Sequence, residues 1–192
     1  NHKSVFFDPL REKSVKGFVN KKDMSKNIIS HRKFSREILK EVDVLVITLG
    51  QNETWRDLKN KTYWGIVPSV SIKKKNKKRF IIEESTVEKN LQDLKWITNS
   101  ILKINKSIQF LFTVSPVPSK ATFIGQDVIL QSFAGKCILR SSIHELMKEA
   151  KSNIFYFPSF EIAIAKNNET YKEDNRHIKF AKIKEIFSFL KN

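Results

Sequence analysis

Three short apolar runs alternate with longer mixed stretches along this chain. The runs cover residues 42–50, 108–114 and 153–157, and each is closed by glycine or proline or by a segment that contains proline. They are rich in β-branched and aromatic residues. Continuous apolar runs of this length predict strands that are buried on both faces of a parallel sheet.

The stretches between and after these runs repeat apolar residues at helical spacing. Helices are predicted over about residues 84–105 and 128–151 and from about residue 178, with a shorter helical pattern around Phe34, Ile38 and Leu39. In the second of these helices we expect Ile138, Leu146 and Met147 to face inward. The last helix is expected to bury five apolar side chains: Phe180, Ile183, Ile186, Phe187 and Leu190.

The order of these elements, strand–helix–strand–helix–strand–helix, predicts an α/β fold. Right-handed crossovers would make the sheet parallel and cover it with helices on both sides, as a three-layer α/β/α sandwich. Residues 51–82 fit none of these elements and read as a long polar segment, which carries Trp55, Trp64 and a lysine run.

Length and composition are those of a single globular domain. The chain has 192 residues, of which 40% are hydrophobic, with 15 Phe, so it can bury a sizeable core. Its single cysteine, Cys137, rules out an internal disulfide and is typical of a reducing compartment. Because Cys137 lies in a helical pattern beside Ile138 and Leu139, we expect a buried structural thiol.

No apolar run is long enough to span a bilayer, and no signal peptide is visible. We therefore expect a cytoplasmic protein without a membrane span. The sequence begins with Asn1 and not with Met, which leaves room for an upstream segment and for a signal within it.

The net charge of +16 has its densest run in residues 73–79, Lys-Lys-Lys-Asn-Lys-Lys-Arg. Such a run could bind nucleic acid or an anionic polysaccharide by neutralising its charges. However, lysines occur along the whole chain, and this run has no interleaved aromatic residues or Gly-Arg repeats. We favour a solvated loop and keep the binding module as the alternative.

Polar segments follow all three predicted strands: residues 50–53, 115–118 and 158–177. In an open α/β sheet the carboxyl ends of the strands form the edge where ligands bind. The third segment contains Asp174 three residues before His177. A carboxylate in that place can orient an imidazole, fix its tautomer and stabilise the imidazolium, as in a Ser-His-Asp hydrolase. Helix capping is the structural alternative for this pair.

Four blocks then occur in a fixed order. They are Thr-Leu-Gly-Gln-Asn-Glu-Thr-Trp (48–55), Val-Ser-Pro-Val-Pro (114–118) with Ala-Thr-Phe (121–123), Tyr-Phe-Pro-Ser-Phe-Glu-Ile (156–162) and Asp-Asn-Arg-His (174–177). Together they resemble the GSCFA domain family, a branch of the SGNH/GDSL-like hydrolase superfamily, over about residues 34–190. The resemblance implies an SGNH-like α/β/α fold and chemistry at acyl esters.

The resemblance also implies site residues. Asp174 and His177 match the superfamily's Asp-x-x-His, with His177 as the general base. Gly50 and Asn52 match its Gly-x-Asn block, in which the asparagine donates to the oxyanion. The alternative for Asn52 is a turn residue that caps a strand end.

The Gly-Ser-Cys-Phe-Ala motif that names the family, and that carries the expected nucleophilic serine, is absent from this chain. We therefore expect the serine and the first strand or strands upstream of residue 1; otherwise the chain is a truncated, inactive relative. Ser115 is a poor substitute, since Pro116 prevents the tight strand-to-helix turn that exposes a nucleophile. Cys137 is a poor substitute for the reason given above.

Members of the superfamily include esterases and acyltransferases, often acting on carbohydrate acyl groups, so a carbohydrate-linked ester is the expected substrate. Glu53, Trp55, Ser115 and Glu161 are candidates for binding it. The structural alternative is that the tryptophans pack the 51–82 segment and that Glu161 satisfies nearby backbone. The four histidines and one cysteine form no metal-ligand spacing, so we expect neither metal nor cofactor. His144 reads as a surface or half-buried residue, and the oligomeric state stays open.

Overall fold

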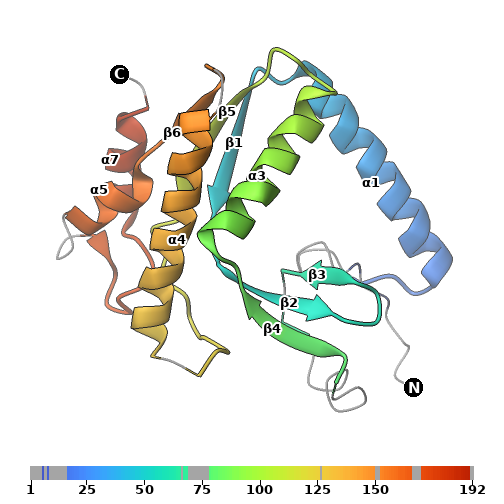
Figure 1. Ribbon diagram of the computed structural model, residues 1–192, viewed down its shortest axis with the longest axis horizontal. Coiled ribbons are helices and arrows are strands. Elements are labelled where there is room, and N and C mark those ends of the chain that lie inside the picture. The colour runs from blue at the N-terminus through green and yellow to red at the C-terminus, as the bar shows by residue number, and fades with distance from the viewer. Residues whose placement is uncertain are drawn as a thin grey trace. The chain divides into compact units, whose positions relative to one another are not determined.

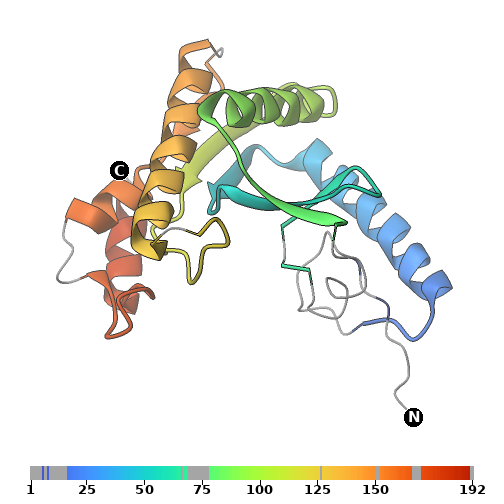
Figure 2. The ribbon, with the colours of Figure 1, turned by 60° about the horizontal axis from the view of Figure 1, so that its bottom comes forward.

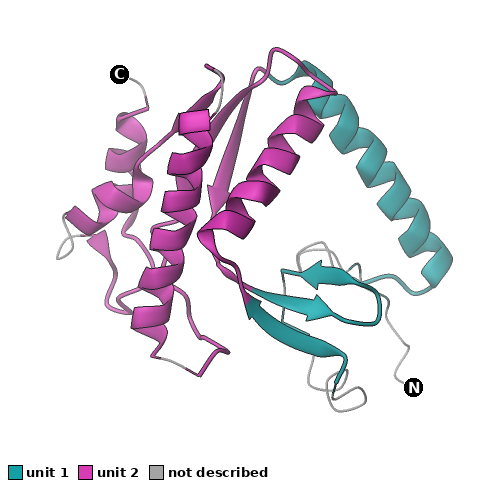
Figure 3. Cartoon of the chain, in the orientation of Figure 1, with its two compact units in different colours: residues 1–42, 54–83 teal, residues 43–53, 84–192 magenta. Residues whose placement is uncertain are grey.

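A computed structural model describes residues 6, 8, 17–65, 67–68, 78–125, 127–149, 152–165 and 170–190. The chain forms two compact units (Figure 3). One comprises residues 1–42 and 54–83, and the other comprises residues 43–53 and 84–192. Each unit contributes most or all of one three-stranded sheet.

The second unit contains a parallel sheet in the order β1-β5-β6 (Figure 1 and, turned by 60°, Figure 2). Its strands are β1 (Val44–Leu49), β5 (Gln109–Val114) and β6 (Ile154–Tyr156). Its helices are α3 (Val87–Leu102) before β5, α4 (Val128–Glu149) between β5 and β6, then α5 (Ser159–Ala165) and α7 (Phe180–Ser188). The predicted alternation of strands and helices is confirmed, and β5 ends at Val114, directly before the Ser-Pro-Val-Pro block.

The core of this unit lies on both faces of β5. Phe110 and Phe112 are fully buried, on the face of β5 towards α4. Leu111 points to the opposite face, against Ala163 of α5 and Ile186 of α7. Helices therefore cover both faces of the sheet, and the predicted α/β/α arrangement is confirmed.

The expectation that all three strands are buried on both faces is wrong for β1. Its side chains alternate: Val44 and Val46 are 46% and 57% exposed, whereas Leu45, Ile47 and Leu49 are partly buried. The reason is that β1 is an edge strand of the described sheet and packs through one face only. Phe155 on β6 is also exposed, so this strand too is half-covered.

Two predictions about helix faces need correction. The buried stripe of α4 includes Ser132, Lys136, Leu139 and Leu146. Cys137 and Met147 lie beside this stripe and are exposed, so the predictions of a buried Cys137 and an inward Met147 are wrong. On α7, Phe180 and Phe187 are exposed, and so is Leu190 just beyond the helix. Ile186 is the buried apolar residue of this helix, because α7 packs against α5 through a narrow stripe. His144 is exposed, in agreement with the prediction of a surface or half-buried residue.

The first unit contains α1 (Lys21–Glu41) and an antiparallel sheet, β2 (Glu53–Asp57), β3 (Thr62–Trp64) and β4 (Phe80–Glu84), in the order β3-β2-β4. This sheet occupies the stretch that was interpreted as a polar segment. The first residue of β2, Glu53, and the last residue of β4, Glu84, belong to the second unit. Trp64 packs edge-on against Phe80, with ring centroids 5.0 Å apart. Lys73–Lys77 lie outside the described residues, while Arg79 forms an ion pair with the buried Asp57 and is not part of a solvated loop.

Candidate active site

The Asp-x-x-His segment forms a tight loop between α5 and α7. Its base is closed by hydrogen bonds from the Lys172 amide to the His177 carbonyl (2.7 Å) and from the Lys179 amide to the Thr170 carbonyl (2.9 Å). Asn175 turns the chain with a φ of 52°, a left-handed conformation that asparagine tolerates better than most residues. The turn brings the side chains of Asp174 and His177 together.

Asp174 is held by three hydrogen bonds. Its Oδ1 accepts from the backbone amides of His177 (2.9 Å) and Arg176 (3.1 Å), and its Oδ2 pairs with Nδ1 of the His177 ring. The ring hydrogen bond, followed by the two amides, holds the pKa of Asp174 well below its usual range. The carboxylate is therefore ionised at neutral pH. This network assigns the imidazole proton to Nδ1 and leaves the lone pair on Nε2.

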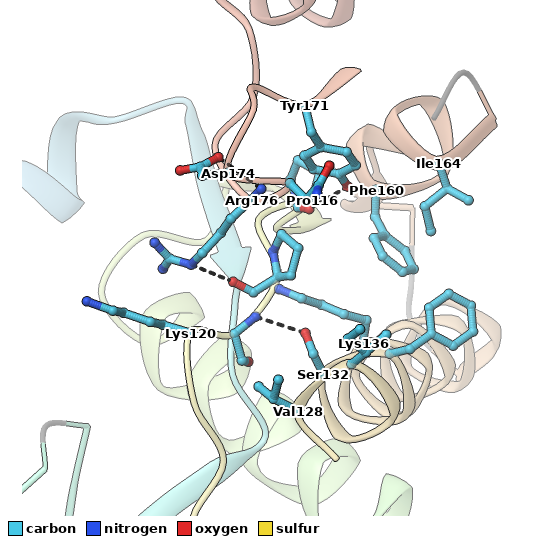
Figure 4. A pocket seen from close by; sticks show the side chains of 15 residues that line it. Pro116, Lys120, Val128, Ser132, Lys136, Phe160, Ile164, Tyr171, Asp174 and Arg176 are labelled. Carbon is cyan, nitrogen blue, oxygen red and sulfur yellow. Dashed lines mark hydrogen bonds between the residues drawn. The ribbon is translucent and has the colours of Figure 1, made fainter. Parts of the chain in front are cut away.

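Arg176 and Tyr171 tie this loop to the segment that follows β5. Nε of Arg176 donates to the Pro118 carbonyl (3.0 Å, dashed in Figure 4), and the Tyr171 hydroxyl donates to the Pro116 carbonyl (3.0 Å). Nη1 of Arg176 lies 3.3 Å from Nε2 of His177. Within the described part of the chain, no hydroxyl or thiol is hydrogen-bonded to the His177 ring.

A cavity of about 760 Å³ lies beside this pair, entirely within the second unit. Its walls come from the segment after β5, from α4 and from α5 with the loop that follows it (Figure 4). Asp174 and Arg176 belong to its wall, whereas His177 and Asn52 are not among its lining residues. The Asp-x-x-His segment and the Ser-Pro-Val-Pro segment thus meet at one cavity, whereas residues 50–53, which follow the first of the parallel strands, are not among its lining residues.

Lys136 is the functional candidate that the sequence analysis missed. It is 3% exposed, and its Nζ donates to the Gly50 carbonyl at 2.7 Å. Burial lowers the pKa of Lys136 to about 8. The sequence contains a sign of this role, because Lys136 is a charged residue at helical spacing from Ser132 and Leu139 on the buried stripe of α4.

Asn52 is buried, and its side chain joins the β1–β2 turn to the start of α3. Its Nδ2 donates to the Ser85 carbonyl (2.7 Å), and its Oδ1 accepts from Nδ2 of Asn90 (2.9 Å). Gly135 allows this packing, since a Cβ on that residue would lie 3.2 Å from the Asn52 Cβ. The amide is occupied in this structure, and its role as an oxyanion donor stays a prediction.

Two other candidates have protein partners. Glu53 accepts from the hydroxyl of Thr122 (2.5 Å) and the amide of Phe123 (3.0 Å) and so fixes the loop before α4. Glu161 pairs with Nε of Arg140 (2.8 Å) and accepts from the Tyr156 hydroxyl (2.7 Å). Burial, reinforced by Glu161, raises the pKa of Tyr156 above its usual range.

The remaining candidates are Ser115, directly after β5, and Trp55, on β2. Ser115 is adjacent to Gly50, and its Oγ accepts from the Val117 amide (3.3 Å). Trp55 belongs to the other unit, on β2 opposite Trp64. Neither residue lines the cavity, and substrate binding by these candidates stays a prediction.

Among the described residues, no three His, Cys, Asp or Glu side chains gather so that they could hold a metal ion. None of the described helices has the length and apolar content required to cross a membrane. The family model of the GSCFA family matches residues 1–189 of the chain. No curated protein matches it.

Proposed function

The chain belongs to the GSCFA family, and from that premise we propose that it acts on acyl esters, as a hydrolase or an acyltransferase of the SGNH type. One observation carries the proposal: an ionised Asp174 holds His177 through Nδ1, so that the lone pair of the base lies on Nε2, where Nη1 of Arg176 now contacts it at 3.3 Å. Those are the two supporting roles of a Ser-His-Asp hydrolase. The adjoining cavity offers room for a substrate.

In the proposed reaction, Nε2 of His177 takes the proton from a serine hydroxyl as its oxygen attacks the ester carbonyl carbon. The negatively charged Asp174 stabilises the imidazolium that forms. His177 then returns the proton to the leaving alcohol, and water or a second alcohol attacks the acyl-serine in the same way. For the first step Arg176 must move away from Nε2, because its guanidinium hydrogen bond occupies the lone pair.

We place the nucleophilic serine in a segment upstream of residue 1. Two observations support this placement. His177 has no hydroxyl or thiol partner among the described residues, and within the described sheet β1 has an unpaired edge along which a further strand could add. The oxyanion would be met by backbone amides and by Asn52, whose Nδ2 would have to leave the Ser85 carbonyl.

The alcohol portion of the ester is proposed to belong to a carbohydrate, on the strength of the family resemblance. The alternative function, an inactive module that binds nucleic acid or an anionic polysaccharide, has the net charge of +16 in its favour. The two proposals differ in which residues matter: Asp174 and His177 for the first, and the basic run at 73–79 for the second.

Hydrolysis of p-nitrophenyl acetate by the protein with its upstream segment tests the enzymatic proposal. Replacing His177 by alanine should lower kcat/KM at least about a thousandfold, and Asp174→Asn should lower it comparably by allowing the wrong tautomer. His144→Ala is the matched control, since His144 is an exposed histidine on α4 outside the cavity, and it should leave turnover unchanged. Turnover that is absent, or that survives in His177→Ala, overturns the proposal.

A further inference from the structure

Lys136 places a positive charge in the interior without a compensating carboxylate. The side chain is almost fully buried, and in the described part of the chain its one hydrogen-bond partner is the neutral Gly50 carbonyl. An ammonium group carries three N–H donors, so two remain for another partner. A buried charge without a counter-ion is costly, and proteins retain such groups where a ligand or a reaction requires them.

The same lysine reaches into the cavity beside Asp174 (Figure 4). The part of the wall formed by α4 and α5 is mainly apolar and incompletely covered by protein: Ile129 and Phe133 of α4 are 75% and 54% exposed, and Ile164 of α5 is also exposed. Phe133 packs against Phe160 with ring centroids 6.1 Å apart, which makes this part of the wall continuous from α4 to α5. A concave apolar wall with one buried cation matches a ligand that has a hydrocarbon body and an anionic head.

We propose that this cavity binds an aliphatic carboxylate, with its head on the Lys136 ammonium and its chain along Phe133 and Phe160. A carboxylate fits better than a phosphate. Lys136 offers a single buried positive charge. Of the two other basic side chains in the wall, Lys120 is exposed to solvent, and the guanidinium of Arg176 is already engaged by the Pro118 carbonyl and the His177 ring. The carboxylate of Asp174 in the wall opposes a doubly charged head further.

Hydrolysis of an aliphatic acyl ester releases a molecule of this kind. The ligand class therefore also names the acyl part of the proposed substrate, and in that respect the inference rests on the proposed function. Binding of the free carboxylate does not depend on catalysis, because it requires neither the serine nor His177.

Calorimetric titration of the chain with octanoate, with acetate and octanol as comparison ligands, tests the inference. We expect saturable binding of octanoate and at least about tenfold weaker binding of both comparison ligands, one lacking the chain and the other the charge. Lys136→Met keeps the length of the side chain without its charge and should weaken octanoate binding by a similar factor. Lys148→Met is the matched control, because Lys148 lies on the same helix but pairs with Glu145 at the surface.

Equal affinity of octanoate for Lys136→Met, or equal affinity of octanol and octanoate for the unaltered chain, overturns the inference. Should Lys136→Met fail to fold, Phe133→Ser decides instead, since this exposed residue can be replaced at little cost to stability: unchanged octanoate binding overturns the inference and weaker binding supports it. Turnover of esters that requires His177, together with no octanoate binding, removes this inference and leaves the proposed function. Octanoate binding without turnover of esters removes the proposed function and leaves this inference.

Discussion

The pKa values of Asp174 and Lys136 are both lowered, but by opposite kinds of surroundings. Asp174 is exposed, and hydrogen bonds from His177 and Arg176 keep it a carboxylate far below neutral pH. Lys136 is buried, and loss of water around its ammonium lowers the pKa to about 8. The first group gives His177 a fixed negative partner, while the second presents a cation whose charge can change within a moderately alkaline range.

The burial of Lys136 predicts a stability that rises with pH. An unfolded lysine keeps its proton up to its ordinary pKa of 10.5, whereas the folded one releases it near 8, so between these values the unfolded state binds more protons. Relative to Lys136→Met, the free energy of unfolding of the unaltered chain should therefore increase by about 3 kcal/mol from pH 7 towards pH 10.5. Urea unfolding of both proteins across this range measures the difference, and parallel pH profiles would contradict the burial of the charge.

At the scale of elements, the sheet of the first unit contains two arginine–carboxylate pairs in different surroundings. Asp57 is fully buried, and Arg79 meets both its oxygens, at 2.8 and 2.6 Å. Arg56 and Glu83 form a partly exposed pair at 3.0 Å. Arg79→Met should lower the free energy of unfolding by about 3 kcal/mol, because it leaves the buried carboxylate of Asp57 without its counter-ion. Arg56→Met should cost less than about 1 kcal/mol.

Tryptophan fluorescence in urea can measure both arginine variants, because Trp55 and Trp64 lie on strands of this sheet. Similar losses for the two variants would show that Asp57 is not the buried anchor of the sheet.

The two edges of β1 differ in their hydrogen bonding. The carbonyls of Asp43 and Leu49 accept from β5, so the odd-numbered residues of β1 bond to its neighbour and the even-numbered ones face the open edge. The amides of Val44, Val46 and Thr48 should exchange hydrogen much faster than those of Leu45, Ile47 and Leu49 in the 192-residue chain. Uniform slow exchange along β1 would show that its outer edge is already paired.

The elements that the sequence predicted are those with strong patterns. The apolar runs at β1, β5 and β6 and the helical spacing at α3 and α4 identified the parallel sheet and the helices that connect its strands. The antiparallel sheet was missed, since its strands are only three to five residues long and none of them is apolar or buried along its whole length. Most of α1 escaped as well, because charged and polar residues predominate along it and none of its residues is buried.

The candidate site divides in the same way. Asp174 and His177 are three residues apart, so their contact follows from local spacing. Lys136 meets Gly50 across 86 positions, and Asn52 meets Asn90 across 38. Contacts of that range depend on how the helices pack, which neither periodicity nor motif reveals. Sequence alone therefore indicated the base and its partner but not the cation in the neighbouring cavity.

At the scale of the whole molecule, the charge of +16 predicts weak, non-specific attraction to polyanions. Binding to a DNA duplex should fall steeply with salt, and replacing the basic residues 73–78 by serine should weaken it, since phosphate neutralisation drives such binding. The same replacement should leave ester turnover unchanged, and His177→Ala should leave DNA binding unchanged. Filter binding at several salt concentrations measures this. Tight binding at physiological salt that is lost on this replacement, together with no ester turnover, would favour the binding module.

The most direct test of the central claim is covalent labelling by a fluorophosphonate, which reacts with a serine activated by a neighbouring base. Treated with it, the protein with its upstream segment should gain a single label on one serine, visible by intact mass and located by peptide mapping. His177→Ala should lose the label, and His144→Ala should keep it. Absence of labelling, or labelling that persists without His177, would contradict the account.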